Sequence, residues 1–375
     1  MAQPAPDAAA TTRKALDLLM SGRYAELAPL FTAEMQKAYP EAGLAKLGEQ
    51  IKSFGAMDYS PNAPHMPRDA MFDLASLTKV VVTTTAAEIL YDRAQLDLNA
   101  PVIRYLPEFA GTPGHDRILV RHLLSHSSGL NSHEVLWKQA HDKPGILNLL
   151  FALPLDWDPG TRTQYRDYNI IVMGEIVSRI TGQNLDEFVT QNVFHPLAMK
   201  HTCYKPPSKY LKRIAPTEND AVLRHTLVRG VVHDENAFLM GGVSGHAGLF
   251  STARDLSTFA QMYLNGGTYG GKRIVAMDTL NTFMQRQSEP PDTSRALGWD
   301  TAVPGSFAGE LASPRAIIHT GFTGTSIYID PDRDAFIVLL TNRVNPTRAN
   351  VEINNARPAI HTAILQALDT SSSRP

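Results

Sequence analysis

Residues 72–92 have the sequence FDLASLTKVVVTTTAAEILYD. The apolar run after FDLA predicts a buried helix in spite of its β-branched residues. Ser76 then lies in the first helical turn, and Lys79, three positions later, lies on the same face within reach of the serine hydroxyl. A lysine can activate a serine when its surroundings lower its pKa, and the N–H groups at a helix start can stabilise an oxyanion. Alone, so short a pattern arises often by chance and more often marks a surface lysine beside a helix-capping serine.

The composition limits the classes of function. The chain has 375 residues, 43% of them hydrophobic, which suits one large domain with an extension, or two domains. Its 35 basic and 37 acidic residues are spread without long runs, so we expect no nucleic-acid partner. The single cysteine, Cys203, excludes an internal disulfide framework and is expected to be a small buried hydrophobic residue.

The compartment stays open at this stage. No apolar run reaches the ~20 residues that cross a bilayer, so we expect no membrane span. The opening MAQPAPDAAATTR has neither the basic region nor the apolar core of a signal peptide. Such a start suits a periplasmic or secreted protein whose leader has been removed, and equally a cytoplasmic protein.

Three regions are expected along the chain: an N-terminal helical region at residues 1–57, a proline-containing linker at 58–69 and the main domain at 70–370. Within the first region, a helix ending at Gly55 is expected to share one apolar face among Leu44, Leu47, Ile51 and Phe54. Near the other end of the chain, the runs TSIYI and AFIVLLT flank residues 330–332 and predict an antiparallel hairpin. The last helix is expected at about 357–368.

Two further motifs follow the Ser-x-x-Lys pattern in order: YRD at residues 165–167 and HTG at 319–321. Together the three resemble the signature elements of the class C β-lactamases, their esterase relatives and the D-alanyl carboxypeptidases, in the serine β-lactamase and penicillin-binding-protein superfamily. The phrases HLLSHSSGL (122–130) and GGVSGHAGLFSTARDL (241–256) extend the resemblance over about 69–368. It implies a β-lactamase/transpeptidase-like α/β (α+β) fold, in which helices flank an antiparallel sheet and a helical part completes the domain.

The resemblance also implies a role for each matched residue. Ser76 attacks the carbonyl, and Lys79 with Tyr165 takes its proton and later passes it to the leaving group. Tyr165 helps to activate the deacylating water, which requires neighbouring cations to stabilise its phenolate. The backbone N–H groups of Ser76 and Phe322 form the oxyanion hole. The substrate-binding residues are expected to be His319, Thr320 and Gly321, with His246 at the rim of the site.

Two residues depart from the family pattern. Asp167 stands where an asparagine is usual, and an ionised aspartate only accepts hydrogen bonds, so it should pair with protonated Lys79 and favour that charged state. Many esterase-like relatives carry this aspartate, which we interpret as tuning toward other substrates. His319 begins the last motif, so recognition of a substrate carboxylate would depend on a group that titrates near neutrality.

No metal or other cofactor is expected. His122 and His126 have the i, i+4 spacing of metal ligands, but no glutamate follows as in a zincin helix, and a structural role is favoured for both. The chain also has no G-x-S-x-G, which excludes the nucleophile elbow of the α/β-hydrolases.

These observations predict a metal-free serine hydrolase that forms a covalent acyl-enzyme. A carboxylesterase acting on small acyl esters ranks first. A cell-wall peptide hydrolase, either an N-acetylmuramoyl-L-alanine amidase or a D,D-carboxypeptidase, ranks second, and a weak β-lactamase ranks third. A penicillin-binding sensor or scaffold that acylates without turnover is the alternative of another class. The expected partners are a small ester, amide or muropeptide substrate and, as one option, a second copy of the chain.

The usual start of the fold is missing from the sequence. Relatives place two strands before the Ser-x-x-Lys helix, whereas here a proline-rich linker follows segments that resemble the opening of a small α+β domain of unknown function. We therefore expect a short sheet of three strands from about Ala316 to Asn342. Its unpaired edge would have to be covered by the N-terminal helices or by a second chain.

Overall fold

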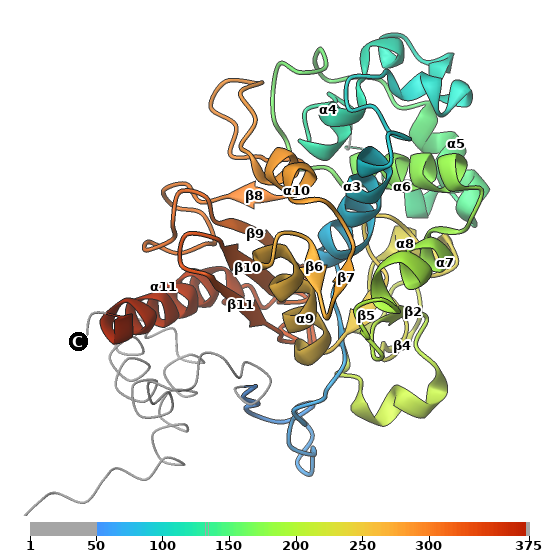
Figure 1. Cartoon of the computed structure of the whole chain (residues 1–375). Coiled ribbons are helices and arrows are strands. Elements are labelled where there is room, and N and C mark those ends of the chain that lie inside the picture. Colours follow the sequence, from blue (N-terminus) through green and yellow to red (C-terminus); the bar gives the residue numbers. More distant parts are fainter. Residues whose placement is uncertain (1–50, 132, 134, 373–375) are drawn as a thin grey trace, which may run out of the picture.

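The computed structural model describes residues 51–131, 133 and 135–372 of the chain (Figure 1). The predicted N-terminal helical region lies mostly outside the described residues, Leu44 and Leu47 included. Residues 51–54 are described and are not helical, and Phe54 is 51% exposed, so the last turn of the predicted helix is wrong. The chain instead turns at Gly55 (φ +72°) and folds back, with the Met66 N–H donating to the Gly55 carbonyl at 2.9 Å. The division into three regions stays a prediction.

A four-stranded antiparallel sheet has the strand order β11-β10-β9-β8. Its strands are β8 (Asp300–Thr301), β9 (Ile317–Thr320), β10 (Ser326–Asp330) and β11 (Ala335–Leu339). The predicted hairpin is confirmed, with Ser326 opposite Leu339 and Asp330 opposite Ala335. We expected three strands, but the sheet has four, because the two-residue β8 pairs with β9 on the side away from β10.

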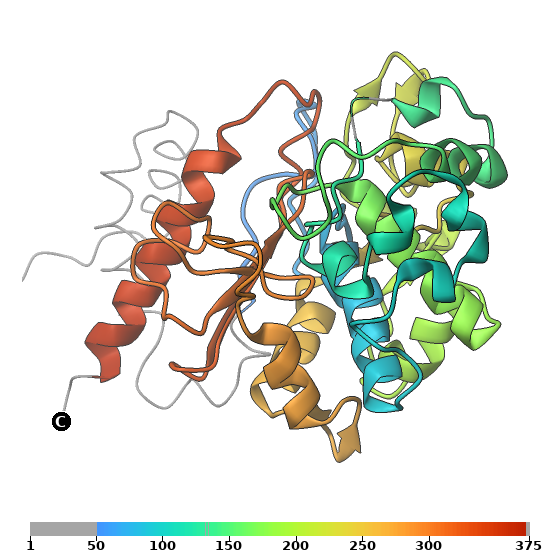
Figure 2. The ribbon, with the colours of Figure 1, turned by 90° about the horizontal axis from the view of Figure 1, so that it is seen from above.

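The two faces of this sheet pack against different helices. Ile318, Tyr328 and Ile337 form a cluster with Leu365 of α11 (Ile353–Ser372), which begins four residues before the predicted helix. The alternate residues Ile327 and Ile329 join the main core together with Phe259 of α9 (Ala253–Leu264). The alternation follows from the two-residue period of a strand. Figure 2 shows α11 along one side of the sheet and the other helices on the opposite side.

The buried helix predicted from the opening motif runs through the centre of the molecule. It consists of a π-helical turn, η2 (Lys79–Thr84), and α3 (Thr85–Asp92), and it lies beside α6 (Asp167–Thr181). The other helices are η3 (Val102–Arg104), η4 (Pro107–Gly111), η5 (His115–Arg117), α4 (Val120–Leu124), η6 (Leu136–Lys138), α5 (Lys143–Phe151), α7 (Leu185–Val189), η7 (Thr190–Phe194), η8 (Ser208–Arg213), α8 (Glu235–Leu239) and α10 (Met277–Met284). Among the described helices, none combines the length and apolar composition needed to cross a membrane.

Three small sheets or hairpins complete the fold. A three-stranded sheet has the order β1-β5-β2, from β1 (Phe72–Asp73), β5 (Leu249–Ser251) and β2 (Cys203–Tyr204). The hairpins pair β3 (Asn219–Asp220) with β4 (Thr226–Leu227) and β6 (Thr268–Tyr269) with β7 (Lys272–Arg273). Among the described residues before Ser76, β1 is the one strand, and it pairs with β5 and not with β11. The N-terminal helices expected to cover the edge of β11 lie outside the described residues.

Candidate active site

A tight turn presents Ser76 at the start of the central helix, whose helical residues begin at Leu77. Ala75, just before it, has the left-handed φ of +46°, a conformation that costs a non-glycine residue about 1–3 kcal/mol. The Asp73 carboxylate holds this turn, because one oxygen accepts the Ala75 N–H at 2.8 Å and the other accepts the His233 N–H at 2.7 Å. The turn therefore ties the serine to a loop far along the chain.

Lys79 lies directly behind the serine and is fully buried. Its ammonium donates to Ser76 Oγ at 2.7 Å and to the His246 carbonyl at 3.1 Å, and it forms an ion pair with Asp167 at 2.7 Å. Burial favours the neutral amine, but Asp167 and Tyr165 outweigh it and leave the pKa of Lys79 above its ordinary value. The expected pairing of Asp167 with protonated Lys79 is thus present, and the lysine is charged at rest.

Tyr165 completes the group around the serine hydroxyl. Its ring centre lies 5.0 Å from the Lys79 nitrogen that donates to Ser76, so the phenol lies beside both residues. Although 39% of the residue is exposed, burial around the phenol and the nearby Asp167 carboxylate raise the pKa of Tyr165, against the opposing effect of Lys79. The expected cation-stabilised phenolate is therefore not the resting state, because burial disfavours the charged form and Asp167 offsets part of the charge of the lysine.

The loop after β9 is bound to the turn that carries Ser76. The Thr323 hydroxyl donates to the Asp73 carbonyl at 2.7 Å, and the Thr325 hydroxyl donates to the Leu74 carbonyl at 3.0 Å. A Cβ atom on Gly321 would lie 2.5 Å from that same Leu74 oxygen, so only glycine allows this close approach. These contacts hold together the two segments whose N–H groups, on Ser76 and Phe322, were expected to form the oxyanion hole.

His319 and Thr320 end strand β9 beside Tyr165, and the His319 ring centre is 6.0 Å from the tyrosine ring. His319 Nδ1 contacts the Thr320 carbonyl at 3.0 Å, and since a carbonyl only accepts, the ring proton is on Nδ1. Burial, together with Lys79 and Arg295, holds the pKa of His319 well below its ordinary value. The expectation that His319 titrates near neutrality is wrong, because the ring is buried among cations and stays neutral.

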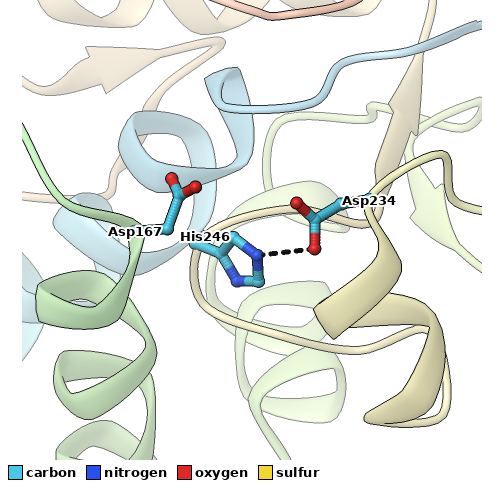
Figure 3. A group of neighbouring side chains, drawn as sticks. All are labelled: Asp167, Asp234 and His246. Atoms are coloured by element: carbon cyan, nitrogen blue, oxygen red, sulfur yellow. Dashed lines mark hydrogen bonds and ion pairs between the residues drawn. The ribbon is translucent and has the colours of Figure 1, made fainter. Parts of the chain in front are cut away.

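His246 is 1% exposed, and both of its ring nitrogens are bonded within the protein. Nε2 lies 2.8 Å from Asp234 Oδ1 (Figure 3), and Nδ1 lies 2.8 Å from Ser244 Oγ. The rim position expected of His246 is therefore wrong. Its contribution to the site is the backbone carbonyl that accepts from Lys79.

Asp234 was not singled out from the sequence. It stands before α8, where its side chain accepts the Ala237 N–H at 2.8 Å, so the sequence signal is that of an ordinary helix cap. Burial opposes ionisation, but His246 and the nearby Lys79 lower the pKa of Asp234. Ligand atoms of Asp167, Asp234 and His246 lie within 4.8 Å of one another and are of the kind that divalent cations use. The Lys79 ammonium already supplies a positive charge to Asp167 here, and we assign no metal to this group.

Arg295 is a second residue that the sequence did not indicate. Its guanidinium lies 5.3 Å from the ring centre of Tyr165, and its nearest carboxylate, on Asp300, is 3.8 Å away. It contributes to the lowered pKa of His319 and of His126. The site thus has two carboxylates on the side of His246 and a loosely paired cation beside Tyr165 and His319.

Comparison with known proteins gives the family. The family model described as "Beta-lactamase" matches residues 42–360. A protein named "Putative D-alanyl-D-alanine carboxypeptidase" from Escherichia coli (strain K12) is 35% identical over 312 residues, which cover 76% of this chain and 71% of that protein. A protein of the same name from Salmonella agona (strain SL483) is 35% identical over 316 residues, which cover 76% of this chain and 72% of that protein.

Solved structures support the fold. A penicillin-binding protein homologue from Caulobacter crescentus superimposes with a TM-score of 0.66 at 20% identity, covering 84% of this chain and 87% of that one. EstCE1, a hydrolase with promiscuous acyltransferase activity, gives a TM-score of 0.62 at 22% identity, covering 82% and 88%. With most of its length matched by the family model, the chain belongs to the β-lactamase family of serine hydrolases.

Proposed function

We propose that this chain hydrolyses small acyl esters through a covalent acyl-enzyme on Ser76. The observation that carries the proposal is the ion pair, at 2.7 Å, between fully buried Lys79 and partly exposed Asp167, beside the serine hydroxyl. Because this pair keeps Lys79 protonated and Tyr165 is a neutral phenol, the resting site holds only weak bases. An ester suits such a site, since an alkoxide leaves with less help from proton transfer than an amine does.

The same carboxylate bears on the choice between esters and amides. Ionised Asp167 only accepts hydrogen bonds, so it cannot donate to the carbonyl of a substrate amide as an asparagine would. A buried polar group left without its bond costs about 1–3 kcal/mol. That penalty falls on amides and β-lactams and leaves simple esters unaffected.

The reaction has two steps in which protons return to their starting place. When the Lys79–Tyr165 pair has lost one proton, it takes the proton of Ser76 as the serine oxygen attacks the carbonyl carbon. The N–H groups of Ser76 and Phe322 bind the oxyanion, the proton passes to the leaving oxygen, and the alcohol departs. Water then attacks the acyl group, gives its proton to the same pair, and the serine oxygen leaves and is reprotonated.

A second candidate is the removal of a C-terminal D-amino acid from a cell-wall peptide. The relatives named D-alanyl-D-alanine carboxypeptidase favour it, and so does Arg295, whose guanidinium is only loosely paired with Asp300 at 3.8 Å. With His319 neutral, Arg295 is the group suited to meet a terminal carboxylate beside Tyr165.

The test compares Ser76→Ala with the unchanged chain on p-nitrophenyl esters of increasing length, nitrocefin and a D-alanyl-D-alanine peptide. We expect wild-type turnover to be fastest on short esters and to be lost in the variant by at least about 10³-fold. Mass spectrometry after fluorophosphonate treatment should locate the adduct on the peptide that contains Ser76. A faster rate on the peptide would favour the second candidate, and an adduct on Ser125, Ser127 or Ser244 would contradict the assignment of the nucleophile.

A further inference from the structure

His126 combines features that packing alone does not explain. It lies in the segment HLLSHSSGL, is 1% exposed, and has the left-handed φ of +57°. A residue other than glycine pays about 1–3 kcal/mol for this conformation, which persists only where the surroundings require it. Its neighbour His122 shows the contrast, because that ring only accepts the Leu119 N–H of its own helix, at 3.1 Å.

The contacts of His126 are centred on Tyr165. The His126 carbonyl accepts the N–H of Gln164 at 2.9 Å, and its Nδ1 accepts the N–H of Arg166 at 3.2 Å. These are the residues on either side of Tyr165 in the chain. The imidazole also lies against the phenol ring, with 4.6 Å between ring centres. One residue therefore holds the backbone before and after the tyrosine and one face of its ring.

We infer that His126 is the positioning residue of Tyr165, which fixes the phenol between Ser76 and Lys79. The inference rests on the role proposed above for Tyr165. Both backbone bonds and the ring contact are needed to place the hydroxyl, because the segment around Tyr165 enters α6 from an extended residue, Arg166 (φ −144°), and has no strand to hold it. A displacement of about 1 Å in a reacting group can cost about 100-fold in rate.

The contacts of His126 with the segment around Tyr165 require a neutral imidazole. Because Nδ1 accepts a backbone N–H, the ring proton is on Nε2, and a second proton on Nδ1 would break the bond to Arg166. Burial, with Arg295, Lys79 and His319 nearby, holds the pKa of His126 well below its ordinary value. The neutral imidazole is therefore favoured, and its Nδ1 is free to accept the Arg166 N–H.

The test uses two variants of His126 that separate the effect of the ring contact from the effect of the hydrogen-bond acceptor Nδ1. His126→Phe keeps the ring contact and loses Nδ1, whereas His126→Asn tolerates the left-handed backbone and keeps a carbonyl acceptor. We measure kcat and KM for p-nitrophenyl acetate across pH, with the melting temperature, in the wild-type and Tyr165→Phe backgrounds. His122→Phe is the matched control from the same segment.

We expect His126→Phe to lower kcat about 10- to 100-fold with KM changed less than about twofold, and His126→Asn to recover part of that loss. In the Tyr165→Phe background the same substitutions should cost less than about threefold, because the group they position is gone. Equal losses in both backgrounds, or none in either, would overturn the inference while leaving the proposed role of Tyr165 intact. Full activity of Tyr165→Phe would overturn both together.

Discussion

Two buried ionisable residues lie on the same central helix but differ in their charge state at neutral pH. Lys79 and Glu88 are both fully buried, one in η2 and one in α3. Lys79 has the Asp167 carboxylate at 2.7 Å and keeps its charge. Among the described residues, the hydrogen-bond partner of Glu88 is the Tyr263 hydroxyl, at 2.9 Å from each carboxylate oxygen, and burial raises the pKa of Glu88 to about 8. The carboxyl is therefore mostly protonated at neutral pH.

The difference shows what a buried charge requires. Removing an ion from water costs several kcal/mol, and only an opposite charge with good geometry offsets that cost. Lys79 has a counter-charge, whereas Glu88, within the described part of the chain, has only a polar neighbour. This difference separates the reactive end of the helix, at Lys79, from its structural end, at Glu88. It also means that the counter-ion sets the pH at which the site becomes active.

The largest effect is expected from removing that counter-ion. In Asp167→Asn, the buried ammonium of Lys79 loses the carboxylate that offsets the cost of its burial. The pKa of Lys79 should then fall, because burial favours the neutral amine and Asp167 no longer opposes it. The pKa of Tyr165 should fall with it, because Asp167 raises both values.

The pH dependence of ester hydrolysis checks this prediction. In the wild type, the rate should rise with pH up to the alkaline limit of the protein, because the active form needs one proton fewer on Lys79 or Tyr165. The variant should reach its plateau at lower pH, and its rate on nitrocefin should rise relative to its rate on esters. Asp234→Asn is the matched control, since this carboxylate lies near Lys79 without bonding to it. A wild-type profile already flat at neutral pH would contradict the account of the ion pair.

Sequence reasoning succeeded where chemistry follows local spacing. Ser76 and Lys79 are neighbours on one helix, and the hairpin strands show their apolar residues at alternate positions, so both could be predicted. The expected helix face failed at Phe54, because three- and four-residue spacing also occurs in a chain that turns at a glycine. Local periodicity carries no information on what a segment packs against.

The residues that sequence reasoning missed come from loops that only the fold brings together. Asp234 has the pattern of a helix cap and Arg295 that of a surface arginine, and neither pattern indicates a neighbour far along the chain. The charged state of Lys79 was expected from Asp167 in the second motif, and the ion pair agrees with it. The neutral state of His319 was missed, because it depends on burial and on the nearby Lys79 and Arg295, which are matters of distance.

A smaller effect is expected at the other end of the helix, in Glu88→Gln. The folded protein holds the Glu88 proton up to about pH 8, whereas the unfolded chain releases it near 4.5. Between these values the folded state binds more protons, so its stability falls as the pH rises, by about 1.4 kcal/mol per unit. Glutamine cannot ionise and removes this slope. Urea unfolding at pH 5, 6.5 and 8 should show the variant gaining about 2 kcal/mol on the wild type between the first two values. Parallel profiles would mean that Glu88 is not perturbed by burial.

The smallest effect near neutral pH is expected from Tyr263→Phe, which tests whether a hydroxyl can substitute for a counter-charge. The ring stays packed against Trp299, whose ring centre is 5.4 Å away, so the substitution removes only the bonds to Glu88. At pH 6.5 the carboxyl is protonated and the loss should be about 1 kcal/mol, the net value of a neutral hydrogen bond. Above pH 8 the wild-type carboxylate is ionised, and its bond to the hydroxyl is worth about 1.5–3 kcal/mol.

The hydroxyl lowers the pKa of Glu88, so the variant should also lose stability over a wider range of pH than the wild type. Urea unfolding at pH 6.5 and at pH 9 measures the loss of stability with the Glu88 carboxyl protonated and with it ionised. A loss that is the same at the two pH values would show that the hydroxyl does not stabilise the charged carboxylate, and that burial alone controls Glu88.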